Sequence, residues 1–195
     1  LFGTTHGYIG QEANAVGIIS ELDKNDTIFS NHRCHGHYLA RTNDVTGLLA
    51  EIMGKSIGLC GGIGGSQHIY AENFYTNGIQ GSFVPIITGM GLAEKINKSS
   101  NIIVGFIGDG TLGQGVVYES LNLMSLNQTP CFIVVENNQY AQTTKIDQNL
   151  AGSIKKRFEA FNIETTELTS TNVLDIKKTS AQIITKIREE RRPCC

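Results

Sequence analysis

The chain has 195 residues, 40% of them apolar, and a formal net charge of −2. This length is enough for one globular domain with a substantial core, and the absence of a long basic run argues against nucleic-acid binding. No apolar run approaches the length of a membrane-spanning helix, and the five scattered cysteines lack a Cys-x-x-Cys pair, which indicates reduced thiols in a reducing compartment.

Helical and strand patterns alternate along the chain. Helices are predicted where apolar residues recur at three- and four-residue spacing, and strands where short β-branched runs end at glycine or polar clusters. In chain order, we predict a helix over 10–23, a strand over 27–30, helices over 45–54 and 86–97, a strand over 102–107, a helix over 115–127, a strand over 131–135, a helix over 154–161, a strand over 163–168 and a helix over 173–191. These elements predict an α/β fold, a parallel sheet with helices on both faces, in a single domain over residues 1–195.

Polar clusters follow two strands of this predicted sheet. Gly108-Asp109-Gly110 ends one strand and Asn137-Asn138 ends the next. Asp109 offers a carboxylate oxygen and Asn138 an amide carbonyl, which are ligands that Mg²⁺ takes together with phosphate oxygens. The glycine-rich start of the helix over 115–127 favours a phosphate. Each cluster alone is also typical of a plain turn, but together they predict a diphosphate held through Mg²⁺ at the carboxyl edge of the sheet.

These residues are similar to the cofactor motif of thiamine diphosphate enzymes. With Tyr140, they resemble in particular the alpha subunit of the dehydrogenase (first) component of 2-oxo acid dehydrogenase complexes, in the pyruvate and acetoin branch, over nearly the whole chain. The resemblance implies a thiamine diphosphate-binding fold. It also implies that Asp109, Asn138 and the Tyr140 main-chain carbonyl hold Mg²⁺, and that Gly108, Gly110 and Thr111 lie at the cofactor diphosphate.

The segment from 31 to 38 carries three histidines, His32, His35 and His37, around Arg33. One interpretation is a Zn²⁺ site, as in a metal hydrolase, although the spacing does not place all three on one helical face. The other is an anion-binding and proton-transfer cluster. The segment resembles a family motif in which the arginine contacts the diphosphate, so Arg33 is the expected ligand. His32 stands where pyruvate enzymes usually carry tyrosine and acetoin-type enzymes carry histidine. His32 and His35 are candidate catalytic residues.

Three further segments extend the resemblance. The segment from Thr5 to Ala13 resembles the family's segment at the active-site entrance, which implies a substrate-channel role for His6. The loop from 61 to 68 resembles a Gly-Gly-Ser-Met-His loop with Gln67 in place of methionine. Residues 77–81 resemble a Gly-Ile-Val-Gly turn whose backbone binds the aminopyrimidine, so Gly78 and Gln80 are candidate cofactor residues, with Gln80 replacing valine. In the helix that follows, Gly89 and Gly91 are expected to permit close approach to the central strand.

The resemblance implies the alpha subunit of an enzyme that oxidatively decarboxylates pyruvate and passes the acyl group to lipoamide. The alternatives are an acetoin dehydrogenase alpha subunit and a diphosphate- and Mg²⁺-binding module that does not catalyse. Both ends of the chain look cut, so a half-site is expected that needs a beta subunit, in a heterotetramer, and a lipoyl-bearing acyltransferase component. The expected location is the cytoplasm, or the mitochondrial matrix in a eukaryote.

Overall fold

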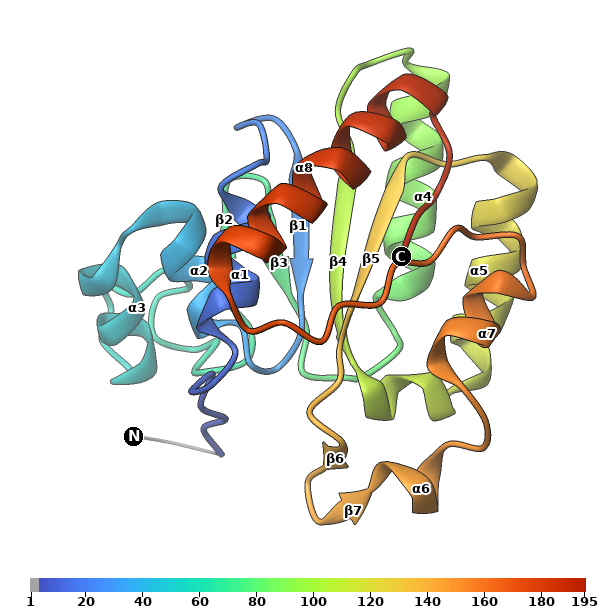
Figure 1. The fold of residues 1–195 in the computed structure, drawn as a ribbon. Coiled ribbons are helices and arrows are strands. Elements are labelled where there is room, and N and C mark those ends of the chain that lie inside the picture. The colour runs from blue at the N-terminus through green and yellow to red at the C-terminus, as the bar shows by residue number, and fades with distance from the viewer. Residues whose placement is uncertain (1–3) are drawn as a thin grey trace.

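A mixed sheet with helices on both faces forms the centre of the fold (Figure 1). The computed structural model describes residues 4–195, and within them one sheet has five strands in the order β2-β3-β1-β4-β5. The strands are β1 (Thr27–Ser30), β2 (Tyr70–Ala71), β3 (Phe74–Thr76), β4 (Ile103–Gly108) and β5 (Cys131–Glu136). β3, β1, β4 and β5 run parallel, and only the short edge strand β2 is antiparallel. The predicted sheet with helices on both faces is confirmed.

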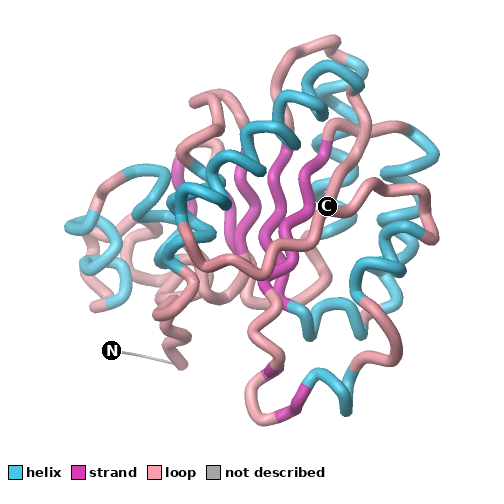
Figure 2. Tube along the Cα trace, viewed as in Figure 1, coloured by secondary structure: helices cyan, strands magenta, loops and turns pink. Residues whose placement is uncertain are grey.

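Alternate residues of the strands divide the core into two layers, one on each face. On β4, Val104 and Phe106 face the layer that contains α1 (Glu12–Ile19) and α8 (Val173–Glu190). Ile103 and Ile107 face the opposite layer, which contains α4 (Val84–Ile96), α5 (Gly115–Asn127) and α7 (Ile154–Glu159). Burial on both faces explains why β4 is a continuous apolar run, as expected for a central parallel strand. Figure 2 shows the strands enclosed between the two sets of helices.

Several elements differ from the sequence-based prediction. The histidine-rich segment forms a helix, α2 (His35–Thr42), before the expected helix α3 (Val45–Ile52). After β5 the chain forms a hairpin, β6 (Tyr140–Ala141) with β7 (Thr144–Lys145), and the short helix α6 (Ile146–Asn149). The predicted strand over 163–168 is wrong. Its backbone pairs with the chain end, where the Thr166 N–H donates to the Cys195 carbonyl and the Cys195 N–H donates to the Glu164 carbonyl. This makes an isolated bridge rather than a strand.

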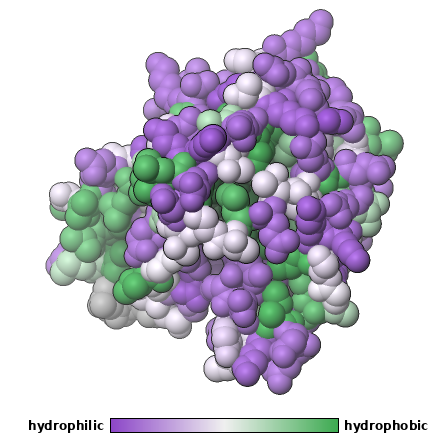
Figure 3. All heavy atoms as spheres, in the orientation of Figure 1, coloured by the Kyte–Doolittle hydropathy of each residue, from purple (hydrophilic) through white to green (hydrophobic). Residues whose placement is uncertain are grey.

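The surface is mainly polar in the view of Figure 3, with apolar side chains gathered over α3. The exposed apolar residues of that helix and the residue after it are Val45, Leu49 and Met53. None of the helices in residues 4–195 is both long and apolar enough to cross a bilayer.

Candidate cofactor site

The carboxyl ends of β4 and β5 bring the two polar clusters together. Gly108 pairs with Glu136 in the sheet, so the residues that follow each strand emerge side by side. Asp109 begins a 3-10 helix, η1 (Asp109–Gly113), and the hairpin β6–β7 packs against it. A Cβ on Gly110 would lie 2.7 Å from the Cβ of Ala141, so only glycine permits this close packing. The predicted juxtaposition of Asp109 with the Asn138 loop is therefore confirmed by the geometry.

Asp109 is the unusual group at this edge. Asp109 is only 2% exposed, and its Oδ2 atom has no hydrogen-bond partner within residues 4–195. Burial raises the pKa of this carboxyl, while the backbone N–H groups of Gly110, Asp109 and Gln139 act in the opposite direction. A buried carboxylate oxygen without a partner is costly unless a cation binds it. The donor set at this position fits a hard divalent cation such as Mg²⁺.

Asn138 and Tyr140 are exposed, in contrast to the buried Asp109. The Asn138 Oδ1 atom accepts a hydrogen bond of 3.0 Å from the Tyr140 N–H, which fixes the amide in the turn. A carbonyl oxygen has a second lone pair, so this amide can still contact a cation. Both residues are exposed, so the cation position that they would complete is open to a ligand from solvent.

A second group of predicted residues forms a chain of contacts that leads to η1. The rings of His6 and His32 lie 4.6 Å apart between centroids and nearly perpendicular. The Nδ1 atom of His32 lies 2.8 Å from the Nε2 atom of Gln80, and the Oε1 atom of Gln80 accepts a hydrogen bond of 3.0 Å from the Thr111 hydroxyl. Gln80 also donates to the Gly78 carbonyl. Residues from four separate segments of the sequence therefore meet beside the glycine-rich turn.

Arg33 and His35 are held by other segments. An Nη1 donor of Arg33 bonds the Gly7 carbonyl at 2.8 Å, so the guanidinium lies against the segment that carries His6. The Nε2 atom of His35 lies 3.0 Å from the Ser66 carbonyl in the glycine-rich loop. Burial lowers the pKa of both His6 and His35; the charge of Arg33 adds to this for His6. Both imidazoles are thus biased toward the neutral form.

His37 belongs to a buried polar cluster that sequence reasoning missed. Its Nε2 atom lies 3.2 Å from a Glu136 carboxylate oxygen and 3.0 Å from the Tyr8 hydroxyl, and its Nδ1 atom lies 2.8 Å from the Ser30 hydroxyl. Asn31 donates to the other Glu136 oxygen. Since Glu136 directly precedes Asn137, this cluster fixes the end of β5 beneath the candidate cation ligands. No local pattern could have paired these residues, because 99 positions separate His37 from Glu136.

A zinc site at the three histidines is not supported. His35 and His37 bond the Ser66 carbonyl and the Glu136 carboxylate, respectively, and His32 bonds Gln80. Across the part of the chain that the structure describes, no group of three or more His, Cys, Asp and Glu side chains is placed to hold a metal ion.

The fold and the site place the protein in a class of α/β proteins with an open sheet and a glycine-rich turn at the carboxyl ends of its parallel strands. This turn begins with a buried carboxylate whose Oδ2 atom has no hydrogen-bond partner within residues 4–195. A model of the dehydrogenase E1 component family matches residues 1–194, and the chain belongs to this family.

Two curated relatives and one solved structure illustrate the similarity. The alpha subunit of acetoin:2,6-dichlorophenolindophenol oxidoreductase from Bacillus subtilis is 36% identical, over 99% of this chain and 59% of that protein. The pyruvate dehydrogenase E1 component subunit alpha from Rickettsia typhi is 36% identical, over 98% of this chain and 60% of that protein. The solved structure, from Mycobacterium smegmatis, belongs to a protein assigned as a thiamin diphosphate-dependent enzyme; it matches with a TM-score of 0.61 and 16% identity, over 100% of this chain and 33% of that one. The chain thus spans about three fifths of the length of these curated relatives, and the structural match supports the fold.

Proposed function

We propose that this chain is the cofactor-binding part of the alpha subunit of a thiamine diphosphate-dependent 2-oxo acid dehydrogenase. The observation that carries the proposal is Asp109 at the start of the glycine-rich turn, whose carboxylate is buried and whose Oδ2 atom has no hydrogen-bond partner in the described part of the chain. The family match and the names of the relatives support the choice of cofactor and reaction class.

In this proposal, Asp109, the Asn138 amide oxygen and the Tyr140 main-chain carbonyl hold Mg²⁺. The backbone of Gly108, Gly110 and Thr111 lies at the diphosphate. Thiamine diphosphate supplies an electron sink for the carbanion that decarboxylation of a 2-oxo acid leaves.

The side chains on the His6 side of the site have separate proposed roles. Arg33 provides a forked cation for the diphosphate, and to do so its guanidinium must turn from the Gly7 carbonyl. His6, His32 and His35 are the proposed catalytic histidines. Because burial lowers the pKa of each, they would serve as neutral hydrogen-bonding groups near pH 7.

The proposed partners are a beta subunit, with which the alpha subunit forms a heterotetramer, and a lipoyl-bearing acyltransferase component. The relatives include alpha subunits from bacteria and a mitochondrial one from Sminthopsis macroura, which supports a cytoplasmic or mitochondrial-matrix location. Turnover is expected only with the beta subunit present.

Calorimetric titration of thiamine diphosphate, with and without Mg²⁺ and with a beta-type subunit supplied, tests the proposal. We expect binding to require Mg²⁺ and to weaken by at least about 10-fold in Asp109→Asn. Loss of a residue that merely orients a metal ligand already costs about 10-fold or more in affinity, and loss of the ligand itself should cost no less. The matched control is Asp147→Asn, at an exposed position on α6.

Equal affinities for Asp109→Asn and Asp147→Asn would contradict the cation site. Binding without turnover in the assembled enzyme would instead favour the alternative of a module that binds the cofactor but does not catalyse. Absence of binding in the wild-type assembly would overturn the proposed function as a whole.

Pyruvate is the proposed substrate, and acetoin is the second candidate. The observation that favours acetoin is His32, which occupies the position of the acetoin-type histidine and lies against His6. Comparison of kcat/KM for the two substrates in the assembled enzyme decides between them. If His32 selects acetoin, His32→Tyr should shift the ratio of the two kcat/KM values toward pyruvate by about 10-fold, the typical effect of one contact in a pocket. An unchanged ratio would show that His32 does not set the preference.

A further inference from the structure

The Gln80 side chain connects three segments of the fold at the candidate site. It lies in the turn between β3 and α4, is half-buried, and bonds His32 after β1 and Thr111 in η1. Its Nε2 atom lies 2.8 Å from the His32 Nδ1 atom and 3.2 Å from the Gly78 carbonyl oxygen. Its Oε1 atom lies 3.0 Å from the Thr111 hydroxyl.

The Gly78 carbonyl fixes which way the Gln80 amide is turned. A backbone carbonyl only accepts hydrogen bonds, so the amide nitrogen must face it; the reversed amide would place two acceptor oxygens at 3.2 Å. The Thr111 hydroxyl can donate or accept and therefore adapts to this orientation. Gln80 thus presents an N–H donor to His32, and the His32 Nδ1 atom must be the acceptor.

A His32 ring that accepts at Nδ1 carries its proton on Nε2. The titratable or charged groups that act on the ring are His6 on the N-terminal segment, the adjacent Arg33, and Glu136 at the end of β5. Burial, followed by the charges of His6 and Arg33, lowers the pKa of His32 to about 4, while the Glu136 carboxylate opposes this. His32 is therefore neutral at pH 7. Its Nε2 atom makes no side-chain hydrogen bond with the rest of residues 4–195 and remains available to a ligand.

We propose that Gln80 is a positioning residue that fixes His32 as the neutral Nε2–H tautomer, which presents a hydrogen-bond donor to an oxygen atom of the ligand bound at this site. The identity of the acceptor rests on the proposed function, whereas the tautomer is a property of this chain alone. Gln80 also joins His32 to Thr111, so the donor is held in register with the turn proposed to bind the diphosphate.

The test of the tautomer is ¹⁵N NMR of the imidazoles in the uniformly labelled 195-residue chain, without cofactor or substrate. A His32→Asn variant assigns the His32 signals. At pH 7 we expect the wild-type His32 to show an unprotonated Nδ1 atom and a protonated Nε2 atom. Gln80→Glu has nearly the same shape and keeps an acceptor for Thr111. Its carboxylate gives up the hydrogen bond to the Gly78 carbonyl and requires a proton on the His32 Nδ1 atom. It should reverse the tautomer and raise the pKa of His32 by about 1–3 units, the usual effect of a nearby opposite charge.

Two further variants separate this effect from a change of structure or of local charge. Gln80→Leu removes the donor without adding charge, so His32 should populate both tautomers. Gln67→Glu makes the same substitution on a side chain that also lies against Gly78 but bonds Thr4 rather than His32, and it should leave the wild-type tautomer in place. A protonated Nδ1 atom in the wild type, or an unchanged tautomer in Gln80→Glu, would overturn the proposal.

The donor role is tested separately in the enzyme assembled with its beta subunit. Gln80→Glu should lower kcat/KM at pH 7 by about 10-fold or more, because moving the His32 proton to Nδ1 removes the neutral Nε2–H donor. A kcat/KM equal to that of the wild type would overturn the donor role. Failure of the wild type to bind thiamine diphosphate would overturn the proposed function but leave the NMR result standing, so the two failures are distinguishable.

Discussion

Glu51 in α3 holds a glycine-rich loop in place through hydrogen bonds to its backbone. It is fully buried, and its two carboxylate oxygens accept four backbone N–H groups, from Cys60, Gly62, Gly64 and Gly65. Burial acts to raise the pKa of this carboxyl, but the four donors outweigh it and the pKa is lowered. The carboxylate therefore stabilises a glycine-rich loop that leads directly to Ser66, the partner of His35.

Glu51→Gln is expected to reduce the free energy of unfolding by about 3 kcal/mol at pH 7, since an amide nitrogen would face backbone N–H donors. Because the folded pKa is lowered, the stabilisation is present above the unfolded pKa of about 4.3 and is lost as pH falls through the folded pKa. Urea unfolding at pH 7 and at about pH 3 should therefore show a smaller difference between wild type and variant in acid. The exposed Glu72→Gln is the control, and a difference that does not change with pH would argue against this role.

Two glycines of α4 differ in what surrounds them. A Cβ on Gly91 would lie 2.3 Å from the Cys131 sulfur and 3.1 Å from the Thr129 Cβ, and both of these residues are fully buried. Gly89 has no atom within 4 Å of the same position. The prediction that both glycines permit close approach to the central strand is wrong for Gly89, which faces outward. For Gly91 the close approach is present, but its partner is the start of β5 and not the central strand β4. The Gly91 contact sets the distance between α4 and the start of β5.

Gly91→Ala should lower the free energy of unfolding by about 1–3 kcal/mol, because the added methyl group overpacks a buried contact. Gly89→Ala in the same helix should instead raise it by up to about 1 kcal/mol, the difference in helix propensity. Thermal and urea unfolding of the two variants measures both effects. Equal changes of the same sign would show that helix propensity, and not the contact with β5, dominates at both positions.

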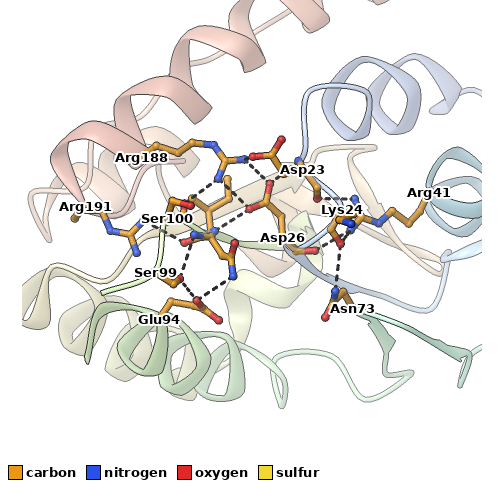
Figure 4. A network of polar contacts seen from close by, with 12 residues as sticks. Asp23, Lys24, Asp26, Arg41, Asn73, Glu94, Ser99, Ser100, Arg188 and Arg191 are labelled. Carbon is orange, nitrogen blue, oxygen red and sulfur yellow. Dashed lines mark hydrogen bonds and ion pairs between the residues drawn. The ribbon is translucent and has the colours of Figure 1, made fainter. Parts of the chain in front are cut away.

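At the scale of the whole molecule, a polar network joins α8 to the amino ends of β1 and β4 (Figure 4). Asp26 is fully buried, accepts from the Ile102 N–H at 3.0 Å and bonds both terminal nitrogens of Arg188. Arg188 also donates to the Ser100 carbonyl, and Arg191 donates to the Asn101 carbonyl. The network lies at the end of the sheet opposite the candidate cofactor site.

Asp26→Asn should lower the free energy of unfolding by about 2–3 kcal/mol, because it removes the buried carboxylate from a partly buried arginine and leaves Arg188 only the exposed carboxylate of Asp23. The control is Glu21→Gln. It breaks the ion pair between Glu21, in the segment after α1, and the exposed Lys177 of α8, and should cost less than about 1 kcal/mol. Urea unfolding measures both. Thiamine diphosphate titration of the folded Asp26→Asn protein should give wild-type affinity; a large loss would show that the two ends of the sheet are coupled.

The pattern of the sequence determined most of the fold. Strands β1, β4 and β5 and helices α1, α3, α4, α5, α7 and α8 were predictable because each is marked by a local apolar period or by a run of β-branched residues. The pairing of Asp109 with the Asn138 loop was also predictable, since the carboxyl ends of adjacent parallel strands meet at one edge. The missed helix α2 and the false strand over 163–168 show the limit: α2 is polar and has few apolar residues to mark it as a helix, and a strand needs a neighbour as well as a propensity.

The partners of individual side chains were decided only by the tertiary structure. The sequence singled out Gln80 by its resemblance to a turn, but its bonds to His32 and Thr111 join positions 48 and 31 residues away. Tertiary packing likewise decides the Glu136–His37 pair. It also decides that Gly91 lies against buried side chains while Gly89 has no neighbour within 4 Å of its Cβ position. Local periodicity fixes which face of an element is buried, whereas the group that a buried polar atom meets depends on how distant elements pack, and this information is not local.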